Sequence, residues 1–100
     1  MHTSKLKIHN LIDLRDFVYT TLCEQNDFEV GAFELSERYL VRSGRPCGIF
    51  FCVHGPRSVR VTAIWEVEGN TILFYGATGE RLLKTRLTQQ VGIAHLAKSA

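Results

Sequence analysis

The connections between the apolar runs in the second half of the chain are too short to join parallel strands. The runs read CGIFFCVH, SVRVTAIWEV and TILFYG, followed by the weaker RLLKTRL. Only GPR, EGN and ATGE separate them, and Gly, Pro and Asn at this spacing are typical of hairpin turns. A parallel crossover needs about a dozen residues or more. The sequence therefore predicts strands that pair antiparallel in chain order, as a meander.

A helix is expected ahead of these strands. Asn10 is a suitable N-cap, and Asp13 suits the positive end of the helix dipole. Apolar residues then recur at helical spacing as far as the polar run 25–27, where the helix should end; they are Leu11, Leu14, Val18 and Leu22. After Gly31 the period changes to two over 33–41, which predicts a further strand, although ELSERYL also suits a helical turn.

The length of 100 residues predicts one domain. An apolar fraction of 45% is ordinary for a globular protein. We expect a single α+β domain over 1–100, in which the N-terminal helix packs on a four- to five-stranded antiparallel meander sheet. Residues 1–9 and about 96–100 are expected to be disordered, and the segment 89–100 suits a short C-terminal helix.

Cysteine content and missing motifs narrow the class of protein. Three cysteines are an odd number, and MHTSKLKIHN lacks the apolar core of a secretion signal. We therefore expect a reduced cytoplasmic protein without a membrane span. The patterns GxSxG, HExxH, Walker and paired carboxylates do not occur in the sequence. This favours a non-enzymatic protein with no cofactor.

The length of each turn decides which residues share a face of the sheet. A two-residue turn at 56–57 would place Cys52 opposite Val61 and Phe50 opposite Ala63. A four-residue loop keeps that pairing, whereas a three-residue loop reverses it. In the pairing set by the two-residue turn, the helix covers the face that carries Phe50, Cys52 and His54.

The second face of the sheet is then the leading candidate for a binding surface. One helix covers only one face, so the apolar part of the other must meet the C-terminal tail, another chain or a ligand. We favour a homodimer or a protein partner, in a small interaction protein. The residues expected to form this binding face are Ile49, Phe51, Val53, Ile64, Leu73 and Tyr75.

The alternative is a binder of nucleic acid or another anion. Between 10 and 37 seven acidic residues accompany one arginine, and between 38 and 60 five arginines accompany no acid. Such runs are often solvated surfaces. Beside Phe51 and Tyr75, however, basic residues suit stacked bases and phosphates. The candidate anion-binding residues are Arg45, Arg57, Arg60, Lys84 and Arg86.

A third hypothesis is a thiol or metal site. Cys47 and Cys52 are five positions apart, so a regular strand sends them to opposite faces. Cys52 and His54 share a face, and Cys23 lies on the helix expected to cover it, which makes a Cys23/Cys52/His54 cluster conceivable. The simpler interpretation is that the cysteines pack as small apolar side chains. The run from Gly76 to Gly79 would suit a phosphate but is more typical of a hairpin turn.

Overall fold

A computed structural model describes residues 8–91 as one helix and one five-stranded sheet. Helix α1 spans Leu11–Gln25. The strands are β1 (Glu34–Arg42), β2 (Arg45–His54), β3 (Arg60–Glu66), β4 (Thr71–Tyr75) and β5 (Arg81–Arg86), and a 3₁₀ turn occupies Pro56–Ser58. All neighbours are antiparallel and the order is β1-β2-β3-β4-β5. The predicted α+β meander is confirmed.

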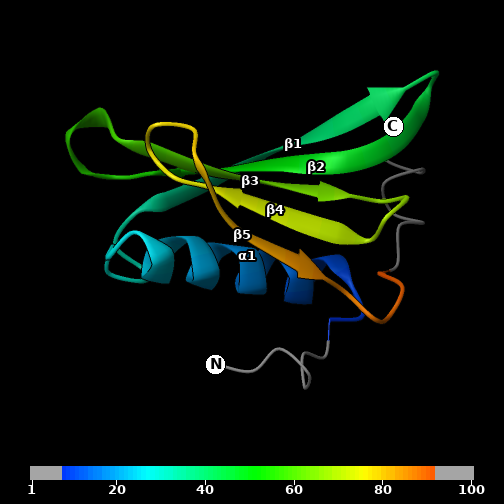
Figure 1. The fold of residues 1–100 in the computed structure, drawn as a ribbon, viewed down its shortest axis with the longest axis horizontal. Coiled ribbons are helices and arrows are strands. Elements are labelled where there is room, and N and C mark those ends of the chain that lie inside the picture. Colours follow the sequence, from blue (N-terminus) through cyan, green and yellow to red (C-terminus); the bar gives the residue numbers. More distant parts are fainter. Residues whose placement is uncertain (1–7, 92–100) are drawn as a thin grey trace.

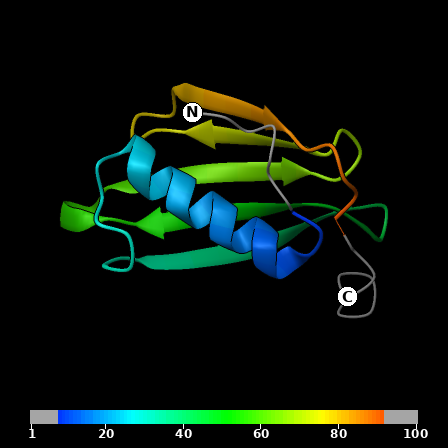
Figure 2. The same ribbon diagram turned by 90° about the horizontal axis from the view of Figure 1, so that it is seen from below.

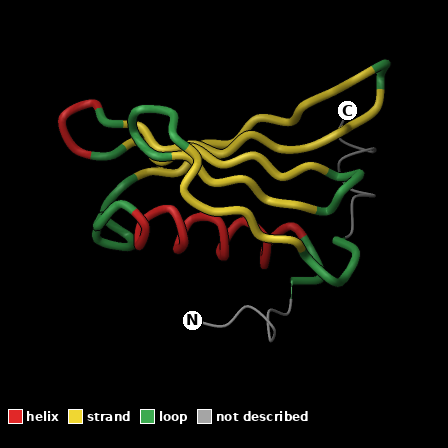
Figure 3. The backbone as a smooth tube through the Cα atoms, viewed as in Figure 1, coloured by secondary structure: helices red, strands yellow, loops and turns green. Residues whose placement is uncertain are grey.

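Helix α1 lies across one face of the sheet and leaves the other face without a helix (Figures 1 and 2). The same two layers are visible in the backbone trace, where the strands run side by side above the helix (Figure 3). The helix begins as expected, because the Asn10 side chain accepts a 2.8 Å hydrogen bond from the Asp13 amide. Strand β1 resolves the ambiguity over 33–41 in favour of a strand.

The predicted chain ends fall mostly outside the described residues. Residues 1–7 and 92–100 lie beyond the described range, and with them most of the segments expected to be disordered or to form a C-terminal helix. Ile8 falls within the N-terminal segment 1–9 that was expected to be disordered, but it is buried against the core. The segment after β5 is anchored as far as Val91, which is also buried.

The core lies between α1 and the sheet. Leu14, Val18 and Leu22 of the helix are fully buried and face the inner side of β2, β3 and β4. Phe17 meets Phe74 edge to face, with ring centroids 6.2 Å apart. The side chains that the sheet contributes are mainly large and apolar: Ile49, Phe51, Val53, Val61, Ala63, Trp65, Ile72 and Phe74.

The face assigned to β2 from the sequence is wrong. Phe51 pairs with Ala63 and Cys52 with Thr62, so the pairing is displaced by one residue from the expected one. The cause is the turn, in which the Gly55 amide donates to the Val59 carbonyl across three intervening residues. A one-residue displacement moves every side chain of a strand to the other face. Ile49, Phe51 and Val53 therefore face α1.

The pairing of β3 with β4 also differs from the expected one, but without consequence for the faces. Trp65 pairs with Ile72, and not with Phe74 as a two-residue turn would require. The displacement is two residues, which preserves the side of every side chain because the period of a strand is two. The predicted pairing of Phe74 with Leu83 is confirmed.

An ion pair fastens β1 to the helix. The Arg15 guanidinium donates through Nε and Nη2 to the two carboxylate oxygens of Glu37, at 2.6 and 2.8 Å. The bond to Glu37 holds the pKa of Arg15 above its usual range. Glu37 lies on the helix side of β1, opposite Phe51.

Replacing Glu37 with glutamine should lower the free energy of unfolding by about 1 kcal/mol, because the pair is bidentate but partly exposed. Urea unfolding at low and high salt measures the loss, and the difference from wild type should shrink as salt rises. Glu24→Gln, on the exposed side of α1, is the matched control and should change stability little. Equal losses in the two variants would contradict the structural role of the pair.

Candidate binding face of the sheet

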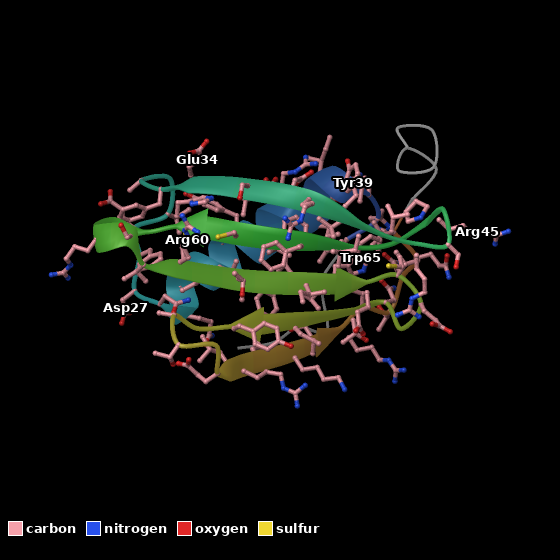
Figure 4. The ribbon with its side chains drawn as sticks, turned by 90° about the horizontal axis from the view of Figure 1, so that it is seen from above. Asp27, Glu34, Tyr39, Arg45, Arg60 and Trp65 are labelled. Atoms are coloured by element: carbon pink, nitrogen blue, oxygen red, sulfur yellow. The ribbon has the colours of Figure 1, made fainter. Side chains whose placement is uncertain are left out.

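The structure separates the six residues expected to form the binding face. Ile49, Phe51 and Val53 are at most 1% exposed beneath α1, so they are removed from the candidate site. Ile64, Leu73 and Tyr75 do lie on the face away from the helix and are half-buried there. We call this side of the sheet the open face (Figure 4).

The antiparallel registers arrange the open face as a grid of four rows that cross the strands. The rows, each read from β1 toward β5, are Glu34–His54–Arg60, Ser36–Cys52–Thr62–Tyr75–Arg81, Arg38–Phe50–Ile64–Leu73–Lys84 and Leu40–Gly48–Glu66–Thr71–Arg86. The third of these is called the central row below. It is the one row that crosses all five strands with a long side chain at every position.

The central row has an apolar middle between two cations. Phe50, Ile64 and Leu73 are half-buried side chains on β2, β3 and β4. Arg38 stands at the β1 end, where its Cζ lies 5.3 Å from the centroid of the Phe50 ring. Lys84 is exposed at the β5 end. The row therefore offers one aromatic plane, two aliphatic neighbours and a positive charge at each edge.

The charge of the open face is net positive. Its rows contain five cations against the acids Glu34 and Glu66; the cations are Arg38, Arg60, Arg81, Lys84 and Arg86. Arg60, Lys84 and Arg86 were expected there from the sequence. The other two predicted anion-binding residues lie at the ends of the sheet: Arg45 at the β1–β2 turn, and Arg57 in the turn after β2.

Two residues of the face were missed by sequence reasoning. Arg38 was not assigned to the face because 33–41 also suited a helical turn. Phe50 was assigned to the core because of the two-residue turn assumed after β2. The signal that would have found both is the three-residue alternative for that turn, combined with a strand over 33–41.

A groove continues the open face toward the β1–β2 turn. Its volume is about 860 Å³, within the size range of small-molecule pockets. It carries charges of both signs, with Arg42 and Arg45 beside the β1–β2 turn, Glu66 at the end of β3 and Glu68 in the turn that follows. The remaining lining is Leu40, Pro46, Cys47, Ile64, Val67 and Gly69.

A serine and a histidine are hydrogen-bonded at the other end of the open face. Ser36 Oγ and His54 Nε2 are 2.9 Å apart, a geometry that would suit a nucleophile and its base. Such a pair needs a third group that orients the base. Glu34 is the cross-strand partner of His54, but no ion pair joins the two within residues 8–91. The arrangement links β1 to β2 and gives no support for catalysis.

The sheet separates the cysteines of the proposed thiol or metal cluster. Cys23 is buried on the helix side, whereas Cys52 and His54 belong to rows of the open face. In the described part of the chain no three His, Cys, Asp or Glu side chains converge on a metal position. Burial raises the pKa of the Cys23 and Cys52 thiols, which disfavours their reactive thiolate forms.

One thiol should react readily with a disulfide reagent and two should not. At pH 8 and low denaturant we expect fast labelling of half-buried Cys47 and slow labelling of Cys23 and Cys52. Folding raises the pKa of Cys23 and Cys52, so ionisation of these two thiols favours the unfolded state once the pH rises above about 8.5. The rate of their labelling should therefore increase above that pH. Mass spectrometry of labelled peptides identifies the order, and rapid labelling of Cys52 would contradict its burial.

The turn between β4 and β5 is a hairpin turn and not a phosphate loop. The Gly76 amide donates to the Glu80 carbonyl at 2.9 Å. The Glu80 carboxylate accepts hydrogen bonds from the amide and the hydroxyl of Thr78, which lower the pKa of Glu80. The carboxylate thus occupies the Thr78 amide that a phosphate would need.

Comparison with family models, curated proteins and solved structures gave no match to this chain. Among the helices of residues 8–91, none has the length and apolar character needed to cross a membrane. The open face is therefore the feature of the molecule from which a function can be inferred.

Proposed function

We propose that this chain is a non-enzymatic binding protein whose open face binds a short stretch of single-stranded nucleic acid. The observation that carries the proposal is the central row, in which Arg38 and Lys84 flank the apolar side chains of Phe50, Ile64 and Leu73. A flat aromatic ring stacks a base, and cations at both edges attract the phosphates that enter and leave the sheet.

The dimensions of the face favour a single strand over a duplex. Neighbouring strands are about 4.8 Å apart, so the central row from β1 to β5 extends about 19 Å. The major groove of B-DNA is about 12 Å wide and admits a helix or a two-stranded ribbon. A five-stranded face is too wide for that groove, whereas unstacked bases and their phosphates can lie along it.

Self-association through the open face, the other candidate from the sequence, is less well supported by its charge. Two copies placed face to face would bring five cations against five, with only Glu34 and Glu66 from each copy to compensate. Like charges brought together in an interface cost free energy. The revised position of β2 also exchanges Ile49, Phe51 and Val53 for Phe50, Cys52 and His54 on this face.

Fluorescence anisotropy with labelled oligo-dT and oligo-U tests the proposal. Binding should weaken as salt rises, with a slope of log K against log [salt] of about −0.7 for each phosphate contact. Phe50→Ala should lower affinity about five- to 150-fold, the range expected for the loss of one stacked base. Lys84→Glu should weaken binding and make the salt slope shallower by about one contact.

Arg57→Glu is the matched control, because it makes the same change of charge in a turn outside the rows. It should weaken binding much less than Lys84→Glu. The proposal fails if neither oligonucleotide binds at low salt, or if Arg57→Glu and Lys84→Glu have equal effects. Poly-glutamate that competes as well as the oligonucleotide would show attraction by charge alone, without base stacking, and would also overturn it.

A further inference from the structure

Strand β1 forms one edge of the sheet, and no described strand pairs with its outer side. It is nine residues long, and six of the nine are exposed. The other edge strand, β5, has six residues. An edge of this length presents a row of free backbone donors and acceptors on which another strand can pair. Figure 4 shows Glu34 and Tyr39 along this outer strand.

Several of the features that block an edge are missing from β1. Its sequence, ELSERYLVR, contains neither proline nor glycine. The irregularity in the β1–β2 pairing comes from an extra residue on β2, Cys47, so β1 itself stays regular. Large side chains remain uncovered there, with Tyr39 37% and Val41 56% exposed. Native proteins protect an edge by shortening, bending or interrupting the strand, or with charged side chains. Strand β1 has four charged residues, but Glu37 pairs with Arg15 and Arg38 lies over the Phe50 ring within the same chain.

The sequence of β1 is complementary to itself in one antiparallel register. When two copies pair symmetrically about Arg38, Glu34 of one copy lies opposite Arg42 of the other, at both ends of the strand. Leu35 then lies opposite Val41, and the two cover each other. Opposite charges and apolar pairs directly across strands are favourable. The register also keeps the open face of one copy level with that of the other.

Neighbouring registers lose this complementarity. A displacement by two residues in either direction places both Glu34 and Arg42 opposite other residues. A displacement by one residue would oppose the two faces of the sheet. The symmetric register does bring two Arg38 residues together at its centre. Each guanidinium, however, already lies over the Phe50 ring of its own chain, which directs it inward and away from the edge.

We propose that a second copy of this chain binds along the outer edge of β1, antiparallel and centred on Arg38. The interface is isologous, with one two-fold axis. It produces a continuous ten-stranded sheet in which both open faces lie on the same side. This assembly does not depend on nucleic acid, so it can be tested separately from the proposed function.

Sedimentation velocity of the full chain, without nucleic acid, measures the assembly over a range of protein concentrations. The wild type should form dimers. Glu34→Arg and Arg42→Glu should each weaken dimerisation about tenfold, because each places like charges opposite one another at both ends of the interface. The double variant Glu34→Arg/Arg42→Glu exchanges the two charges and should restore the wild-type dimer.

Two further variants make the outcome specific. Arg45→Glu changes a charge beside Arg42 but on β2, away from the outer edge, and should leave the dimer intact. Leu73→Glu places an acid on the open face and should also leave it intact. A monomer at every concentration, a double variant that stays dissociated, or a dimer broken only by Leu73→Glu would each overturn the proposal. Assemblies of more than two copies would also overturn the proposal, because they indicate pairing of β1 with β5. Circular dichroism verifies that each variant is folded.

Discussion

Replacing Phe51 with alanine is expected to lower the free energy of unfolding by about 3–5 kcal/mol, the usual cost of removing a fully buried phenylalanine. Phe51 is 1% exposed and packs beneath α1. Its neighbour Phe50 is half-buried on the open face, so Phe50→Ala should cost much less stability and should act mainly on binding. Urea unfolding followed by the fluorescence of the buried Trp65 measures both variants.

This pair of variants is its own control, because the two residues are identical and adjacent in the same strand. The chemistry of the substitution is the same, and only the face differs. If Phe50→Ala proved the more destabilising of the two, β2 would have the opposite orientation. The open face would then carry Ile49, Phe51 and Val53, as the two-residue turn predicts.

Gly48→Ala is expected to destabilise the protein by about 1–3 kcal/mol, the usual cost of forcing a packed backbone to shift. A Cβ atom at Gly48 would collide with the backbone carbonyl oxygen of Trp65 on the neighbouring strand. Backbone atoms in the middle of a sheet cannot move aside as a flexible side chain can. The change adds only one methyl group, so thermal and urea unfolding report a purely steric effect.

Gly69→Ala is the matched control for Gly48→Ala. The nearest atom to a Cβ at Gly69 is the hydroxyl of Thr71, at 3.3 Å, and Gly69 belongs to the exposed turn after β3. We expect this variant to cost less than Gly48→Ala. Equal stability of the Gly48→Ala variant and the wild type would show that β2 and β3 are less closely packed at this point.

The elements of this fold could be predicted because local signals agreed with the global arrangement. Asn10 caps the helix at its start, and the helix ends at the polar run 25–27, as the sequence indicates. The short connections left no alternative to antiparallel pairing in chain order. Even the displaced pairing of Trp65 did not change the composition of the faces, since a shift of two residues preserves the side of each side chain.

The orientation of β2 could not be predicted because a single turn residue decides it. Gly55 and Pro56 indicate where the turn begins but not how many residues it contains. The turn closes between Gly55 and Val59, and Arg57 and Ser58 both adopt positive φ, at 55° and 64°. Non-glycine residues rarely adopt positive φ, and nothing in the identity of Arg57 or Ser58 indicates this conformation. The content of the open face follows from this one local conformation.

The candidate site was therefore only half predictable. The expected cations Arg60, Lys84 and Arg86 were placed on the correct face because β3, β4 and β5 kept their predicted parity. Arg38 and Phe50 needed the strand assignment of 33–41 and the three-residue turn together. The proposed thiol cluster failed for the same reason, since the orientation of β2 moved Cys52 and His54 away from Cys23.

Mapping the contact of an oligonucleotide by nuclear magnetic resonance tests the central claim most directly. Titration of isotope-labelled protein with a short oligo-U should shift the signals of Phe50, Ile64 and Leu73, together with those of the flanking cations Arg38 and Lys84. The signals of α1, including Leu14 and Val18 on the opposite side of the sheet, should stay in place. Shifts confined to α1, or no shifts at low salt, would contradict the account.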